Sequence, residues 1–160
     1  FTTNRMLIDY EERFYNKLAQ RKKLMLDKNY IMARQIAAWK RKVSAAWDNI
    51  VIRDVKRAEI ESEAMYVGKK YHFELTIDLA GLQKEDIGAE LVVATQIEAG
   101  QAANVVETRR LEIVASDDKS VTLALDYAPE HTGMFDVALR VFPVNDNLEH
   151  RMDFALVKWA

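Results

Sequence analysis

Cysteine is absent from this chain, and glycine and proline are scarce, with five and two residues in 160. Without cysteine there is no disulfide, no thiolate nucleophile and no cysteine-ligated zinc. The glycines are scattered singly. They therefore build no phosphate-binding loop, which needs several backbone N–H groups close to one anion. Long flexible linkers, low-complexity tracts and internal repeats are absent as well.

Long apolar runs are also missing, and no stretch is long enough to span a bilayer. The hydrophobic share of 49% and the charged share of 30% are typical of a soluble globular protein. The lack of cysteine fits a reducing compartment, so we expect a cytoplasmic protein with no membrane partner. The chain begins without methionine inside a helical pattern, and no signal peptide precedes it. We therefore expect it to be the tail of a larger protein.

Charge is divided unevenly along the chain. Residues 1–48 hold 11 Lys and Arg against 5 Asp and Glu, whereas residues 49–160 hold 12 against 20, giving +6 and −8. Such a split can indicate a nucleic-acid surface, or a basic segment that packs on an acidic neighbour. The second interpretation is favoured because the cations are interleaved with an aromatic-rich helical pattern. We expect no nucleic-acid partner.

The first part of the chain has helical periodicity. Four apolar residues recur every four positions and predict a helix from about Thr3 to the segment 20–29: Met6, Tyr10, Phe14 and Leu18. Asp27 or Asn29 can cap a second helix, which continues to about residue 50. Its apolar stripe consists of Met32, Ile36, Trp39, Val43 and Trp47. Core packing is the favoured role of both tryptophans in this stripe.

After residue 49 the period changes from helical to two. Residues 71–79, 120–127 and 134–142 alternate apolar and polar side chains, as in antiparallel strands with one buried face. Weaker strand patterns occupy 49–55, 89–97, 109–116 and 152–159, and we expect an exposed acidic loop at 58–65. The sequence thus predicts an α+β chain. An N-terminal pair of helices (1–48) precedes an immunoglobulin-like antiparallel β-sandwich of about seven strands (49–160).

Candidate catalytic residues are few. His72, His131 and His150 have no metal-ligand spacing and adjoin no obvious nucleophile, so surface histidines are the favoured interpretation. The carboxylates in 84–86 and 116–118 fall at turns, where Asp and Glu are common for capping and solubility. We predict no catalytic, cofactor-binding or metal-binding residue. For binding a glycan, only Tyr66, Tyr127 and Phe142 are plausible, and we expect the last two to pack in the core.

Three stretches resemble the C-terminal region of bacterial α-glucan (glycogen or starch-type) phosphorylases with an extended C-terminus. They are "FTTNRMLIDYEERFY", "GLQKEDIGAELVV" and "TGMFDVALRVFPVNDNL" with the closing "FALVKW". Lys84 stands where the family pattern has proline. The resemblance implies a parent enzyme that transfers glucose from an α-1,4-glucan to phosphate, giving glucose 1-phosphate. It also implies pyridoxal phosphate held by a lysine in a Gly-Thr-Gly-Asn-Met-Lys type segment, which this sequence lacks.

Three functional hypotheses follow. The leading one is a non-catalytic accessory module whose helices anchor a sandwich on the catalytic domains of the same parent chain. An alternative is a module that binds α-glucan, which raises the local polymer concentration near an active site. The third is a protein or nucleic-acid adaptor that uses the basic helices, and the acidic sandwich argues against it because it would repel phosphates. A sandwich fold alone cannot separate them.

Overall fold

The computed structural model describes residues 3–57, 65–95 and 104–160. Most of the acidic loop predicted at 58–65, and the end of the strand predicted at 89–97, lie outside the described residues. The chain forms two compact units, Phe1–Arg41 and Lys42–Ala160, and each is described by itself. Within the described residues, no helix combines the length and the apolar character needed to cross a membrane.

The helical part is one helical region rather than two separate helices. α1 (Thr3–Tyr10) continues through a π-helical turn, Glu11–Tyr15, into α2 (Asn16–Trp47). Inside α2, Asn29 and Tyr30 have positive φ angles of 58° and 63°, which a right-handed helix does not contain. The regular helix is therefore interrupted close to the position where the sequence predicts one helix to end and the next to begin.

Burial differs along this helical region. Val43 and Trp47 of α2 are buried, in line with the predicted apolar stripe. The large apolar side chains nearer the N-terminus are instead exposed, although their spacing also forms a stripe. They include Met6, Leu7, Tyr10, Phe14 and Leu18, each more than half exposed.

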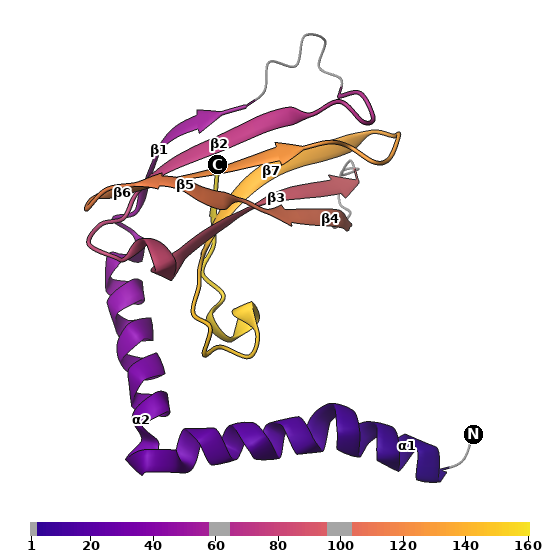
Figure 1. The fold of residues 1–160 in the computed structure, drawn as a ribbon, viewed down its shortest axis with the longest axis vertical. Coiled ribbons are helices and arrows are strands. Elements are labelled where there is room, and N and C mark those ends of the chain that lie inside the picture. The colour runs from indigo at the N-terminus through magenta and orange to yellow at the C-terminus, as the bar shows by residue number, and fades with distance from the viewer. Residues whose placement is uncertain (1–2, 58–64, 96–103) are drawn as a thin grey trace. The chain divides into compact units, whose positions relative to one another are not determined.

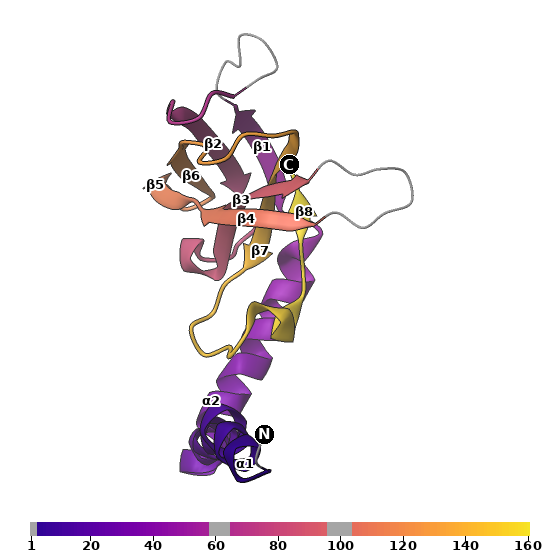
Figure 2. The same cartoon turned by 90° about the vertical axis from the view of Figure 1, so that its right-hand side faces the viewer.

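The second unit contains the end of α2 and two four-stranded antiparallel sheets (Figure 1, Figure 2). One sheet has the order β1-β2-β6-β5 and the other the order β4-β3-β7-β8. The strands are β1 (Val51–Lys56), β2 (Tyr71–Asp78), β3 (Ile87–Thr95), β4 (Val105–Arg110), β5 (Glu112–Ser116), β6 (Ser120–Tyr127), β7 (Phe135–Pro143) and β8 (Lys158–Trp159). Together the sheets make a sandwich-like fold.

The predicted alternation of buried and polar side chains is confirmed most clearly in β2, where every second residue from Tyr71 to Ile77 is buried. β2 pairs with β6 over its whole length, with Leu75 opposite Leu123 and Ile77 opposite Val121. These side chains are at most 1% exposed. Leu91 and Leu139 form the corresponding pair between β3 and β7. Side chains from both sheets thus form the core, as expected for one apolar face per sheet.

The strand count is eight rather than about seven, and the difference arises at Leu111. The segment predicted as one strand, 109–116, is divided between β4 in one sheet and β5 in the other. The buried Leu111 lies between them and donates its N–H to the carbonyl of Ala89 at 2.9 Å. The residue pattern of a strand does not record which strand lies beside it, so the sequence pattern does not reveal this crossing.

The last predicted strand, 152–159, is also different in the structure. It begins in a short 3₁₀ helix, Arg151–Phe154, continues without regular secondary structure, and forms a strand only at β8. The ammonium group of Lys158 donates to the carbonyls of Asp48 and Ile50, at 3.3 and 2.9 Å. These carbonyls lie just beyond α2, so the C-terminal tail is fixed to the segment that links α2 to β1.

Candidate functional site: a cavity at one end of the sandwich

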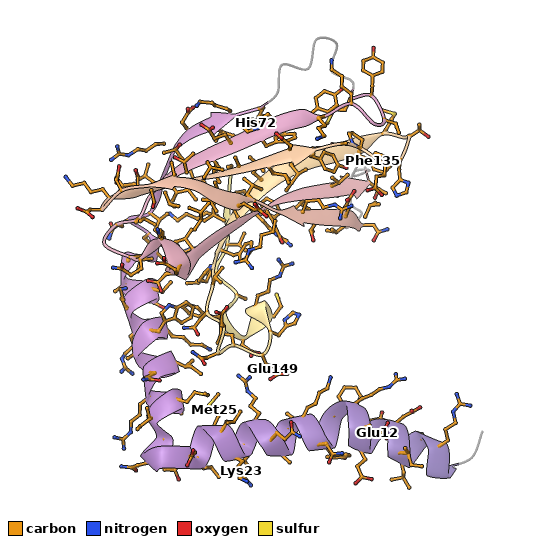
Figure 3. All side chains as sticks on the ribbon, viewed as in Figure 1. Glu12, Lys23, Met25, His72, Phe135 and Glu149 are labelled. Carbon is orange, nitrogen blue, oxygen red and sulfur yellow. The ribbon has the colours of Figure 1, made fainter. Side chains whose placement is uncertain are left out.

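A cavity of about 670 Å³ lies between the two sheets at one end of the sandwich. β2 and β6 contribute to its wall from one sheet, and β3, β4 and β7 from the other. Its lining includes Arg57, Met65, Tyr66, Val67, Phe73, Leu91, Val93, Val106, Glu107, Tyr127, Pro129, His131, Thr132, Gly133, Met134, Phe135, Asp136, Val137, Ala138 and Leu139. Phe135 is labelled at this end in Figure 3.

Hydrogen bonds fix the loop before β2 at the mouth, and one of them joins it to the loop after β6. The backbone N–H of Tyr66 donates to the hydroxyl of Tyr71 at 2.7 Å. The N–H of Gly68 donates to the carbonyl of Pro129 at 3.0 Å, which links the loop before β2 to the loop after β6. The mouth of the cavity is therefore shaped by fixed backbone contacts.

Gly133 also shapes the mouth. Its φ of 151° lies in a region that L side chains rarely adopt, and a Cβ there would meet the ring of Phe135 at 2.9 Å. Glycine at this position lets the loop pass close against the Phe135 ring. The ring is thereby held at the start of β7, where it lines the cavity.

A polar group of three side chains adjoins the cavity, and two of them, Glu107 and Tyr127, line it. The hydroxyl of Tyr127 donates to Oε2 of Glu107 at 3.1 Å. The other carboxylate oxygen, Oε1, is buried and faces Nε of Arg109 as an ion pair, but it accepts no hydrogen bond from the protein. Arg109 also donates to Glu130 at 3.2 Å, so its charge is shared between two carboxylates.

Tyr127 is a weaker acid than an ordinary tyrosine, and burial is the main cause. Burial raises the pKa of Tyr127 to about 12, and the negative charge of Glu107 acts in the same direction. The Tyr127 hydroxyl is consequently protonated over the whole neutral range and acts as a hydrogen-bond donor to Glu107.

The three aromatic residues predicted as glycan candidates are separated by the structure. Tyr66 and Tyr127 line the same cavity, Tyr66 being 62% exposed and Tyr127 buried as expected. Phe142 is also buried as expected, and its ring lies against Gly88 and 5.5 Å from the guanidinium of Arg151. It is not among the cavity-lining residues.

Sequence reasoning missed Glu107, His131 and Phe135 as members of one site. They come from β4, from the loop after β6 and from β7. Phe135 carries only the alternation of a core position, and Glu107 lies outside every strand predicted from the sequence. No local spacing connects them, because the site is assembled from segments distant in sequence.

The histidines are exposed, as predicted, and lie apart in the fold. His72 lies on the outward face of β2, where its Nδ1 is 2.7 Å from a carboxylate oxygen of Asp126 (Figure 3). His131 lines the cavity mouth. His150 caps the short helix Arg151–Phe154 by accepting the N–H of Met152 at 3.1 Å.

The turn carboxylates have structural contacts of the kind predicted for them. Asp86 accepts the N–H of Gln83 and pairs with Lys42, both at 3.0 Å. Asp117 accepts the N–H groups of Lys119 and Ser120, both at 2.7 Å, and these bonds hold its pKa below the usual value.

The described lining of the cavity can be compared with what pyridoxal phosphate and metal ions require. Its described lining contains no lysine, so it offers no amine for a Schiff base with pyridoxal phosphate. Within residues 3–57, 65–95 and 104–160, no group of three His, Asp or Glu side chains is placed to hold a metal ion.

These features define a class: an antiparallel β-sandwich domain that follows a helical segment and contains a small-molecule-sized cavity. Residues 47–160 match the sequence family described as the glycogen phosphorylase C-terminal domain. The match covers more than half of the chain, and the chain belongs to this family.

Curated relatives agree with this assignment. The chain is 27% identical to the maltodextrin phosphorylase of Thermococcus litoralis over 99% of its own length and 18% of that protein. It is 27% identical to a glycogen phosphorylase of Mycobacterium tuberculosis over 87% of its length and 14% of that protein. The chain thus spans less than a fifth of the length of these relatives. No solved structure gives a significant match.

Proposed function

We propose that this chain is the non-catalytic C-terminal accessory module of an α-glucan phosphorylase. The parent enzyme would phosphorolyse α-1,4-glucan to glucose 1-phosphate. Family membership and the names of the relatives support this assignment. Because the chain corresponds to less than a fifth of those relatives, the parent's catalytic domains would be its partners within the same polypeptide.

The exposed apolar side chains of the helical segment are the surface through which this chain would be anchored on the catalytic domains. Leu7, Phe14 and Leu18 are 60%, 54% and 61% exposed, and eight further large apolar residues between Met6 and Ile31 are at least 47% exposed. A surface of this kind marks an interaction site. Residues 1–48 have a net charge of +6, so we expect the surface of the parent enzyme that covers them to be acidic.

For the sandwich itself, we infer an immunoglobulin-like arrangement. The order β1-β2-β6-β5 has the connectivity of the A-B-E-D sheet of that fold. The order β4-β3-β7-β8 corresponds to the opposite sheet with one added edge strand. Such sandwiches serve many proteins as scaffolds, so this inference concerns shape and leaves the function to the sites.

Pyridoxal phosphate remains a proposal for the parent enzyme. The described lining of the cavity contains no lysine to hold this cofactor, and its binding residues would belong to the rest of the polypeptide. A cytoplasmic location, and the absence of nucleic-acid and membrane partners, also stay predictions.

The test compares the parent phosphorylase with this chain alone. We expect the double variant Phe14→Gln with Leu18→Gln to lower the melting temperature of the parent by several degrees, because it weakens the anchoring contact. The same double variant should leave the sandwich of the isolated chain unchanged. Replacing two neighbouring charged residues, Arg13→Gln with Lys17→Gln, is the matched control, with a smaller effect expected.

Two results would contradict the proposal. One is phosphorolysis of maltodextrin by the isolated chain, with pyridoxal phosphate supplied. The other is amide exchange in residues 5–31 that is equally fast in the parent and in the isolated chain, since a covered surface slows exchange.

A further inference from the structure

We propose that the π-helical turn Glu11–Tyr15 sets the register of an anchoring face, which fits one apolar groove with an acidic rim on the parent's catalytic domains. Four residues define the anchoring face: Met6, Tyr10, Phe14 and Leu18. The identity of the partner rests on the proposed function, whereas the alignment of the four side chains rests on the helix itself.

The spacing of the anchoring face does not match a regular α-helix. Each residue of an α-helix advances the chain by about 100°, so a step of four residues exceeds one full turn by about 40°. Three such steps separate Met6 from Leu18, which gives a drift of about 120°. In a regular helix the four side chains would therefore wind around the helix and would not lie on one side of it.

The π-helical turn removes most of this drift. The backbone N–H of Asn16 donates to the carbonyl of Glu11, five residues earlier, whereas an α-helical bond reaches back four. The turn thus holds one extra residue, and the helix after it is rotated back by about 100°. The drift between Met6 and Leu18 falls to about 20°. Both ends of the anchoring face therefore lie on the same side of the helix.

The aligned side chains contact one another but do not belong to the core of this chain. The ring centres of Tyr10 and Phe14 lie 5.6 Å apart, and all four side chains of the anchoring face are more than half exposed. A π-helical turn is rare and is found frequently at functional sites. Since the alignment does not serve the chain's own core, it indicates a contact with an external surface.

The charges beside the anchoring face indicate the chemistry of that surface. Arg5, Arg13 and Lys17 each directly precede a member of the face, so they flank it on one side, about 100° around the helix. An amphipathic helix of this kind binds by laying its apolar side chains in a groove, and carboxylates on the rim complement the flanking cations. Because the chain spans less than a fifth of its relatives, such a groove would lie within the same polypeptide.

The experiment changes the length of the helix by one residue at the exposed Glu12, in the parent phosphorylase. Deleting Glu12 removes the extra residue, so the π-helical turn becomes an α-helical turn and the anchoring face stays aligned. Inserting one alanine after Glu12 instead rotates Met6 and Tyr10 by about 100° away from Phe14 and Leu18. We expect the deletion to leave the melting temperature close to that of the unmodified parent, and the insertion to lower it by several degrees.

Two controls accompany this pair of variants. Glu12→Ala removes the same side chain without changing the register, and should leave the melting temperature of the parent unchanged. Circular dichroism of the isolated 160-residue chain should show the same helix content in the deletion and insertion variants, because both keep good helix formers around the site. A loss confined to the parent then reports the contact and not the folding of the helix.

A deletion that costs as much as the insertion, or more, would overturn the inference, and so would an insertion without effect. These outcomes are distinct from failure of the anchoring role itself. If Phe14→Gln with Leu18→Gln lowers the melting temperature of the parent while the insertion is harmless, the anchoring role stands and the register has no importance. If the double variant is harmless as well, the anchoring role also fails.

Discussion

Glu90 is a buried carboxylate in the middle of β3, and its environment shows how single residues stabilise this fold. Its side chain is 8% exposed and contacts the guanidinium groups of Arg140 on β7 and Arg151 from the C-terminal tail. Arg140 in turn lies 5.6 Å from the ring centre of Trp159. A buried charge is tolerated only when it is paired, so Glu90 holds the tail against the sheet.

Glu90→Gln should destabilise the chain by about 3 kcal/mol, because it leaves two guanidinium groups beside a neutral amide. Urea unfolding would measure the free-energy change. Arg151→Gln is the comparison, since the Arg151 side chain is 42% exposed and its loss should cost less than about 1 kcal/mol. Equal losses from the two variants would show that Glu90 is not the centre of the cluster.

His72 adds a dependence on pH at the same scale. Its hydrogen bond to Asp126 is the main cause that raises the pKa of His72 above its ordinary value, and the charges of Asp126 and Glu74 also contribute. A raised pKa means that the folded state holds the proton more tightly than the unfolded state. This contribution to stability is therefore fully present below the ordinary histidine pKa and is lost as the pH rises through the raised value.

We expect Asp126→Asn to lower the pKa of His72, measured from its ring proton shifts. The same variant should reduce stability more at pH 5 than at pH 8. If the pKa of His72 were the same in the Asp126→Asn variant, the 2.7 Å contact between His72 and Asp126 would have no energetic role.

Among the elements, β3 is the most enclosed, with every residue from Ile87 to Ala94 buried. Gly88 pairs with Phe142 of β7, and a Cβ at Gly88 would meet a methyl group of Val144 at 2.7 Å and the Phe142 ring at 3.2 Å. Glycine is therefore required here by close packing, and no unusual φ angle is involved.

Gly88→Ala is expected to destabilise the chain by roughly 1–3 kcal/mol through overpacking. Adding Val144→Ala removes the methyl group that is contacted first, so the double variant should recover part of the loss. Thermal unfolding of the two variants would give both values. An unchanged single variant would mean that Val144 moves aside at no cost.

At the scale of the whole molecule, the described core belongs almost entirely to residues 42–160. Apart from Ile36, the buried apolar residues begin at Val43, and the exposed apolar surface is concentrated in residues 6–31. The two units therefore differ in what stabilises them. The sandwich has its own core, whereas the helical segment offers apolar surface for a partner.

Residues 42–160 alone should consequently unfold in one cooperative transition near that of the 160-residue chain, and should self-associate less. Calorimetry and sedimentation would measure these properties. Deleting residues 151–160 is the contrasting change, because it removes Arg151 and Lys158 and should lower the transition. If residues 42–160 did not fold, the helical segment would have to be part of the folding unit.

Much of this architecture was predictable from periodicity. The alternation in β2, β6 and β7 located those strands, and the change of period after residue 49 separated helix from sheet. The crossing at Leu111 and the shortening of the last strand to β8 were not predictable. Both depend on which strand lies alongside, and a single strand's pattern does not record its neighbour.

The sequence by itself determined the broad class, the buried faces of the central strands, and the resemblance to phosphorylase C-terminal regions. Each of these depends on local spacing or on contiguous residues. Only the tertiary structure decided that Tyr66 and Tyr127 share a cavity with Glu107 and Phe135, while Phe142 does not. The physical reason is that sheet pairing joins segments distant along the chain, so the partners of a side chain are set by topology and register.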